Sequence, residues 1–236
     1  MFEIFHPTPL TSIWDRALLG PVAEFNQQLL EGLCLAAIAA TPTAGATSEV
    51  ASEGGALTGA RPPPANSHGA PRLVVVLREA WCGLDQRSLQ RLSGCPYLLI
   101  DAGFARPERW GPSPVGVRDA GQRGGYFSDR AAVALIRRTL VFGWHLARCN
   151  RAAARLVLGM SAATAERIAA RGLNELEAVA ESSPSWIVPR WEQQPNVWRQ
   201  LIAAACQDNP VQLREAQLRG LQLLAGAAGG RGPGGS

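Results

Sequence analysis

The sequence predicts a mainly α-helical protein, and three observations support this fold class. Leu and Ala dominate the apolar residues, and both favour helices. Apolar residues recur at spacings of three and four over long stretches. The aromatic residues that favour strands are scarce, with 2 Tyr and 6 Phe among 236 residues. Because 47% of the residues are hydrophobic and 18% are charged, the chain is long and apolar enough to fold around a core.

Changes in composition divide the chain into a multi-helix C-terminal domain, a helical N-terminal extension and the segments around them. We expect N-terminal helices at 1–40, a flexible linker at 41–71, a small helical region with a loop at 72–125, a helical domain at 126–206, and a short helix with a disordered Gly-rich tail at 207–236. The linker consists mostly of Ala, Gly, Ser, Thr and Pro. Such a composition buries too little apolar surface to offset the entropy cost of ordering the chain.

The first 40 residues carry apolar side chains at helical spacing from Trp14 to Ile38. This spacing predicts one or two amphipathic helices, broken at Gly20-Pro21. The most apolar run, Leu29 to Ala40, contains Glu31 and has no basic segment before it. It is also too short to span a bilayer, so we expect a cytoplasmic protein without a signal peptide or membrane contact.

Two short helices are expected after the linker. The β-branched run from Leu73 to Leu77 is compatible with a strand, but its continuation to Trp81 favours a helix, and Asp85 is a good N-cap for a second helix. The stretch Cys95 to Ile100 supplies a compact apolar cluster together with Phe104 and Trp110. A loop rich in Pro and Gly follows, from 106 to 125.

The longest helix is expected to begin after Ser128-Asp129, which is a strong N-cap sequence. Four apolar residues form one stripe along it: Val133, Ile136, Leu140 and Trp144. Further apolar residues widen this stripe beyond one face, and a helix that is apolar on most sides must be covered on most sides. We therefore predict that these four residues bury a homodimer interface.

Helix boundaries are marked clearly in the rest of this domain. Gly159 is a natural stop for the helical pattern. Ser161 caps a short helix, Gly172 separates it from a third helix, and the third helix ends before Pro184. The segment from Trp186 to Trp191 is expected to be extended, and Pro195 suits the first turn of a last helix with Val197, Trp198, Leu201 and Ile202.

The sequence offers little chemistry for catalysis, so we expect no catalytic site, no metal and no cofactor. Its three histidines are far apart, its five cysteines form no C-x-x-C pair, and hydrolase, nucleotide and zinc-protease motifs are missing. The cysteines are expected to be reduced and mostly buried. A small hydrolase that uses Asp85 or Asp101 is a third hypothesis, but helix caps and solvated charges explain these acids.

Every basic side chain is an arginine, since the sequence contains no lysine. A GC-rich coding sequence would explain this without any function, so the distribution of charge is more informative. Residues 128–206 hold ten Arg against six Asp plus Glu, whereas residues 1–127 hold ten against eleven. This surplus points to a polyanionic partner. The candidate DNA-binding residues are Arg148, Arg151, Arg155, Arg167, Arg171 and Arg190, as contacts to the phosphate backbone.

The order of landmarks in residues 129–206 resembles the flagellar transcriptional regulator FlhD family. The landmarks are a long apolar helix, the sequence Arg155-Leu-Val-Leu-Gly-Met160, a short helix from Ser161 to Ile168, a helix that begins at Leu173 and ends Val-Ala-Glu181, and an extended segment that closes on Arg190-Trp191. The resemblance covers about a third of the chain, and residues 1–127 have no counterpart in that family.

This resemblance implies a helical, intertwined dimer that acts with a partner regulator similar to FlhC to activate transcription of flagellar or related operons. In that family the partner contributes the zinc site and much of the DNA contact. The favoured hypothesis is therefore a transcriptional co-regulator that reaches promoter DNA in a complex. The alternative is a protein–protein interaction adaptor that never contacts nucleic acid.

Overall fold

The computed structural model describes residues 16–40, 70–111, 126–207 and 209–229. Within these ranges the chain is mainly α-helical, which confirms the predicted class. The helices are Arg16–Ala39 (α1), Arg72–Val76 (α2), Arg78–Cys82 (α3), Gln86–Ser93 (α4), Asp129–Cys149 (α5), Arg151–Leu158 (α6), Ala162–Ala169 (α7), Leu173–Ser182 (α8), Pro195–Cys206 (α9) and Pro210–Gly229 (α10). Pro107–Trp110 (η2) and Pro184–Trp186 (η3) form short 3-10 turns. Most of the predicted linker (41–69), part of the predicted loop (112–125) and the last residues of the tail (230–236) lie outside the described residues.

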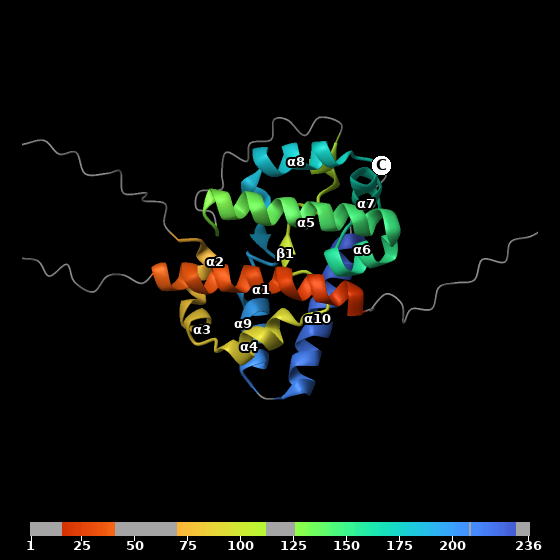
Figure 1. Cartoon of the computed structure of the whole chain (residues 1–236). Coiled ribbons are helices and arrows are strands. Elements are labelled where there is room, and N and C mark those ends of the chain that lie inside the picture. The colour runs from red at the N-terminus through yellow and green to blue at the C-terminus, as the bar shows by residue number, and fades with distance from the viewer. Residues whose placement is uncertain (1–15, 41–69, 112–125, 208, 230–236) are drawn as a thin grey trace, which may run out of the picture.

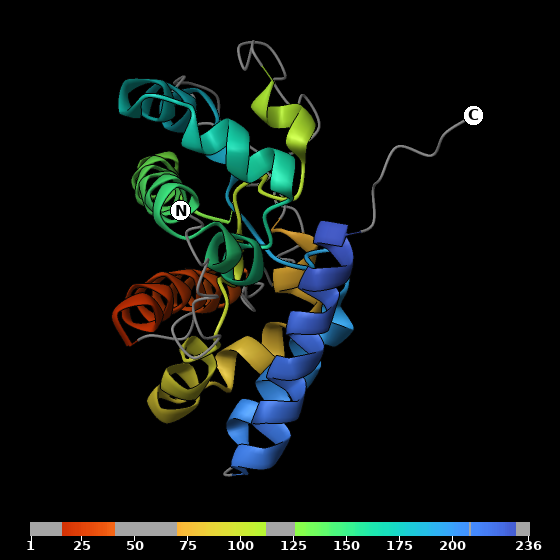
Figure 2. The same ribbon diagram turned by 90° about the vertical axis from the view of Figure 1, so that its right-hand side faces the viewer.

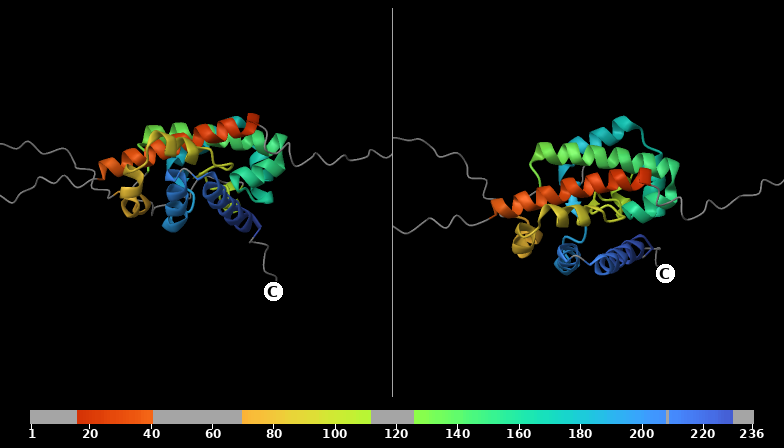
Figure 3. Two further views of the ribbon diagram at one scale, coloured as in Figure 1. Left: turned by 90° about the horizontal axis from the view of Figure 1, so that it is seen from below. Right: turned by 60° about the horizontal axis from the view of Figure 1, so that its bottom comes forward.

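The helices form two layers with a very small sheet between them. In Figure 1, α8, α5, α1 and α4 lie one below another in the layer that faces the viewer. Figure 2 shows α9 and α10 as an antiparallel pair along the opposite side, and Figure 3 shows this pair set apart from α1 and α5. The strands Ile100–Asp101 (β1) and Val188–Pro189 (β2) pair antiparallel between the layers.

One hydrophobic core joins the N-terminal, middle and C-terminal parts of the chain. The clearest link between the N-terminal helix and the C-terminal domain is a ring contact: the centroids of Phe25 on α1 and Phe142 on α5 are 5.4 Å apart. Arg138 on α5 lies 3.7 Å from the Glu24 carboxylate on α1. The predicted N-terminal extension is therefore packed against the domain that follows it.

The predicted break at Gly20-Pro21 is wrong, because α1 continues through Pro21. Pro21 lies in the second turn of the helix, where its missing N–H removes one hydrogen bond, to the carbonyl of Ala17. Burial of Val22, Phe25, Leu29 and Leu33 along the same helix offsets this loss. Packing of the whole helix thus outweighs a local signal that would end an isolated one.

Asn26 is a fully buried polar residue on the inner face of α1. Its Nδ2 donates to the carbonyl oxygens of Ser93 at 3.2 Å and Tyr97 at 3.0 Å, and it lies 3.4 Å from that of Cys95. Its Oδ1 accepts from the N–H of Leu99 at 2.7 Å. One side chain therefore satisfies several backbone groups of the irregular segment between α4 and β1, in which Leu98 also donates to the carbonyl oxygen of Val157 on α6.

The apolar stripe of α5 is covered by helices of the same chain, so the predicted need for a second subunit is corrected. Ile136 and Leu140 are fully buried within the single chain, while Val133 and Trp144 are partly buried. Helices α7 and α8 pack directly on α5, and Phe25 of α1 covers another side. The wide apolar stripe of α5 is buried, as its sequence pattern predicts, but the helices that bury it belong to the same chain and are far apart in sequence.

The predicted stop at Gly159 and the predicted boundaries of α7 and α8 are confirmed, whereas the sequence pattern did not predict the break between α5 and α6 at Asn150. Asn150 ends α5 and caps α6 by accepting from the N–H of Ala153 at 3.0 Å. Gly159 ends α6 with φ 63°, a left-handed conformation that favours glycine. Ser161 accepts from the N–H of Thr164 at 3.0 Å and so caps α7. Ser128 precedes α5 as predicted, although its side chain makes no capping hydrogen bond.

The expected short last segment is in fact a long helix. Helix α10 continues to Gly229, beyond Ala225, where the sequence predicts disorder. It packs closely on the core at Gly220, where a Cβ would lie 2.0 Å from the Tyr97 hydroxyl oxygen. Only a glycine allows this approach, which explains how a Gly-containing helix docks here. No described helix is long and apolar enough to cross a membrane.

Candidate nucleic-acid interface

Three candidate arginines gather at the junction of α5 and α6. Arg148 is in the last turn of α5, and Arg151 and Arg155 lie one turn apart on α6. Because Asn150 ends one helix and caps the next, the chain turns between them. We refer to Arg148, Arg151 and Arg155 as the arginine corner.

The arginine corner is exposed and its positive charges are not neutralised by nearby acids. All three side chains are exposed, and none forms an ion pair with another described residue. The Arg148 guanidinium stacks on the Trp144 ring, 4.7 Å from its centroid. The Trp144 indole in turn donates to the carbonyl oxygen of Arg171 at 2.9 Å. The ring that supports Arg148 is therefore held in place, while the guanidinium edge remains available to an anion.

Arg167 and Arg171 hold a loop in place. The Arg167 guanidinium donates to the carbonyl oxygen of Pro107. Arg171 donates to the carbonyl oxygen of Gly111 at 2.7 Å, and its guanidinium lies 6.0 Å from the Trp110 ring centroid. Both side chains thus fasten η2 to α7, and we assign them a structural role.

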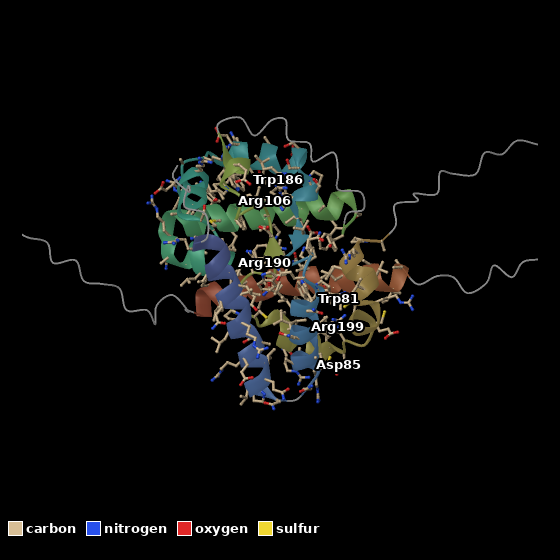
Figure 4. All side chains as sticks on the ribbon, turned by 180° about the vertical axis from the view of Figure 1, so that it is seen from behind. Trp81, Asp85, Arg106, Trp186, Arg190 and Arg199 are labelled. Carbon is tan, nitrogen blue, oxygen red and sulfur yellow. The ribbon has the colours of Figure 1, made fainter. Side chains whose placement is uncertain are left out.

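Arg190 is buried, which corrects its assignment as a DNA contact. Its side chain donates to the carbonyl oxygens of Leu98 and Leu158, at the centre of the molecule (Figure 4). Its own carbonyl accepts from the Trp198 indole at 2.5 Å, and its N–H donates to Leu99 at 2.8 Å. One residue therefore connects β1, the end of α6 and α9.

The charge of Arg190 is stabilised by the end of a helix. Leu158 is the last residue of α6, where the helix dipole places partial negative charge. Burial lowers the pKa of the Arg190 guanidinium, and the charge of Asp101 acts in the opposite direction. A Cβ on Gly159 would lie 3.1 Å from Nη1 of Arg190, so the glycine also makes room for this cap.

The acids of α8 are exposed, as expected for a helix that avoids phosphates. Glu181 pairs with Arg137 at 2.9 Å, and Glu175 lies 3.7 Å from Arg171. Both carboxylates are more than half exposed, so these pairs contribute little to stability. They do neutralise Arg137 and Arg171, whereas no described acid pairs with the three arginines of the corner.

The acids of the hydrolase hypothesis serve as backbone caps. Asp85 accepts from the N–H of Ser88 at 2.7 Å. Hydrogen bonds from the Ser88 side chain and from its backbone N–H hold the pKa of the Asp85 carboxyl below its usual value. Asp101 accepts from the N–H of Phe104 at 3.1 Å. Two cavities lined by described residues, of about 710 and 350 Å³, include neither acid.

The cysteines are all free thiols, in line with the expected reduced state, although three of them are exposed: Cys82, Cys149 and Cys206. The Cys149 sulfur lies 3.8 Å from Nδ1 of His145, on the exposed side of α5. Among the described residues no group of three or more His, Cys, Asp or Glu side chains is placed to hold a metal ion.

The buried thiol of Cys95 and the half-buried thiol of Cys34 make stability depend on alkaline pH. Burial raises the pKa of Cys95 to about 12 and that of Cys34 to about 11. An unfolded thiol titrates near pH ~8.5, so above that pH the unfolded chain releases protons that the folded chain keeps. Each thiol therefore makes its full contribution to the free energy of unfolding below pH ~8.5. This contribution is lost as pH rises through the folded pKa.

We expect the free energy of unfolding to fall between pH 9 and 11, by up to about 1.4 kcal/mol per pH unit for each such thiol. Cys95→Ala should flatten this decline, whatever its effect at neutral pH. Urea unfolding at pH 7.5, 9, 10 and 11 measures both slopes. Equal slopes for the variant and the original chain would contradict the burial of an un-ionised thiol at position 95.

No protein-family model, curated protein or solved structure matches this chain. The charge pattern of the sequence marks Arg148, Arg151 and Arg155 as candidates, but it marks Arg190 equally, although Arg190 is buried. The sequence marks both Gly159, as a helix stop, and Arg190-Trp191, as a landmark. Only the fold shows that Gly159 lies next to the Arg190 guanidinium.

Proposed function

We propose that this protein is a DNA-associated transcriptional co-regulator, similar to FlhD, that acts with a partner regulator on promoter DNA of flagellar or related operons. The observation that supports this proposal best is the arginine corner, in which three exposed guanidinium groups lack acidic partners among the described residues. Planar guanidinium groups bind phosphate oxygens in a bidentate manner.

The contacts at this corner suit the phosphate backbone rather than the bases. Arg151 and Arg155 are separated by one helical turn, and Arg148 is braced by Trp144. Phosphate contacts fix the position of a protein on DNA, but they carry no sequence information directly. Sequence reading is therefore assigned to the partner regulator, as the family resemblance implies.

The homodimer that the resemblance implies would need a surface other than the predicted one. Ile136 and Leu140 are inside the core, so exposing them would cost roughly 1.5–3 kcal/mol for each side chain. We therefore do not assign the dimer to the α5 stripe. Size measurement by sedimentation equilibrium determines the oligomeric state of the full chain directly.

The arginine corner predicts salt-dependent DNA binding that charge reversal removes. Arg151→Glu combined with Arg155→Glu should weaken binding of a duplex of about 25 base pairs by at least tenfold at low salt. If each arginine neutralises one phosphate, the slope of log affinity against log salt should also decrease by about 2. Fluorescence anisotropy of the labelled duplex, with and without the candidate partner, measures both quantities.

A matched control makes the same charge change elsewhere. Arg87 on α4 and Arg214 near the start of α10 are exposed and belong to other elements. Reversing these two charges should change affinity much less than reversing those of the corner. The proposal fails if the two double variants weaken binding equally, or if the affinity of the original chain does not fall with salt.

The alternative function is a protein-interaction adaptor without nucleic-acid binding. The observation that favours it is the set of exposed aliphatic side chains near the junction of α1 and α2. Lack of DNA binding at low salt, alone and with the partner, would favour the adaptor over the co-regulator.

A further inference from the structure

An aliphatic patch lies where the C-terminal end of α1 meets α2, at the left side of Figure 1. Four side chains form it: Leu35 is 67% exposed, Ile38 59%, Val75 55% and Val76 46%. We refer to these four residues as the aliphatic patch. Isolated exposed aliphatics are common on protein surfaces, but four of them on two helices that contact one another make a candidate contact site.

A hollow adjoins the patch and gives it the form of a groove. This cavity has a volume of about 710 Å³ and is lined by the patch residues Val75 and Val76, by Ala40 at the end of α1, and by Arg199 of α9. The walls thus come from three elements that are distant in sequence. A groove of this kind beside exposed valines can receive the apolar side of a helix.

The cavity lining has a net positive charge, from two arginines against one glutamate. Arg78 and Arg199 line the cavity together with Glu79, and Arg72 is exposed at the start of α2. None of the three arginines forms an ion pair with another described residue, and the hydrogen bond found for the Arg199 side chain is to Asn196. Trp198, which precedes Arg199 on α9, packs its ring against that of Trp81 on α3, with the centroids 5.3 Å apart; Figure 4 labels Trp81 and Arg199. The turn of α9 that carries Arg199 is therefore held in place by packing, while the Arg199 guanidinium remains available to an acidic partner.

We propose that the aliphatic patch and its arginine rim dock an acidic amphipathic helix of another protein. Aliphatic side chains would enter the groove, and Glu or Asp side chains on the flanks of that helix would meet the arginines. The proposal concerns elements other than the arginine corner, so it does not rest on DNA binding.

Charge favours an acidic helix over two other occupants of this surface, a second copy of the chain and DNA. A second copy of the chain would bring two positively charged rims together across a two-fold axis, and like charges at an interface cost binding energy. DNA would meet the arginines, but its phosphates would also face Leu35, Ile38 and the valines, which offer no hydrogen-bond donors. An acidic and apolar helix satisfies both parts of the surface.

The test uses the full chain and a defined probe. The probe is a fluorescein-labelled peptide of about 18 residues with Leu at helical spacings of three and four and Glu on both flanks. We expect binding that weakens as salt rises, and binding at least tenfold weaker for the same peptide with Lys in place of Glu. Failure of the acidic peptide to bind at 100 µM, or equal binding of the two peptides, would overturn the proposal.

Two sets of variants separate the apolar and the charged contributions. Ile38→Asp combined with Val75→Asp should weaken the acidic peptide by at least tenfold. Arg78→Glu combined with Arg199→Glu should weaken the acidic peptide and strengthen the basic one, which a merely structural effect would not do. Val211→Asp is the control, because Val211 is 63% exposed on α10 and lies outside the patch.

Two further measurements on the same variants decide between occupants. The chain should have the same sedimentation behaviour with and without the patch variants; a dimer that Val75→Asp dissociates would assign the patch to a second copy and overturn the proposal. DNA affinity should be unchanged in the patch variants. If it falls with them as with the corner variants, the patch belongs to the DNA-binding surface and the proposal is wrong.

Discussion

Asn26→Asp is expected to destabilise the protein by about 4 kcal/mol or more, because it places a buried carboxylate against carbonyl oxygens. The Nδ2 atom of Asn26 faces three carbonyls at 3.0 to 3.4 Å, so an oxygen at that position meets only acceptors. The introduced carboxyl must either remain ionised in an apolar site or take up a proton. Its folded pKa is therefore raised, and the stability of this variant should fall further as pH rises through that pKa.

A nearly isosteric apolar replacement separates lost hydrogen bonds from added charge. Asn26→Leu removes the same bonds without a charge, and we expect a smaller loss of about 2–3 kcal/mol. Gln27→Glu makes the same chemical change at an exposed position of α1 and should change stability by about 0.5 kcal/mol or less. Urea unfolding at pH 5 and pH 8 gives these values. The assigned role of Asn26 is wrong if its Asp variant is within about 1 kcal/mol of the original chain.

Arg190→Met is expected to cost about 3 kcal/mol, because it leaves the buried carbonyls of Leu98 and Leu158 without donors. Arg190→Lys retains the charge, but a single ammonium group lacks the planar fork that reaches both carbonyls, so it should not restore stability. Denaturant unfolding measures both variants. Arg214→Met, at an exposed position of α10, is the control and should have little effect.

DNA binding provides a second readout for Arg190. Below the denaturation midpoint, the folded fraction of Arg190→Met should bind DNA as the original chain does, because the side chain cannot reach the surface. A selective loss of DNA affinity with unchanged stability would restore the sequence-based assignment of Arg190 as a phosphate contact. This comparison therefore distinguishes the two roles.

The arginines of the candidate site have environments that charge alone does not distinguish. Arg148, Arg151 and Arg155 were predicted as phosphate contacts from the charge distribution, and the fold leaves them exposed, while their DNA contact stays a prediction. Arg190 was selected by the same criteria, but its acceptors are 92 and 32 residues away in sequence. No local pattern encodes such contacts. The sequence around an arginine that caps a buried helix end therefore does not distinguish it from an exposed arginine that binds phosphate.

The apolar residues of α5 show the same limit, because their spacing does not reveal which surface covers them. Their spacing predicted a helix that must be covered on most sides, and the structure agrees that Ile136 and Leu140 are inaccessible. The covering surfaces are α1, α7 and α8 of the same chain. Hydrophobic burial is not directional, so the pattern shows that a surface is buried but not what buries it.

The sequence by itself determined the helical class, the capping residues Asp85 and Ser161, and the stop at Gly159, because these depend on backbone groups within four residues. Only the tertiary structure decided that α1 continues through Pro21, that Arg190 is internal and that the aliphatic patch is exposed. Those outcomes depend on which apolar faces meet, and side-chain packing between distant segments has no counterpart in local sequence.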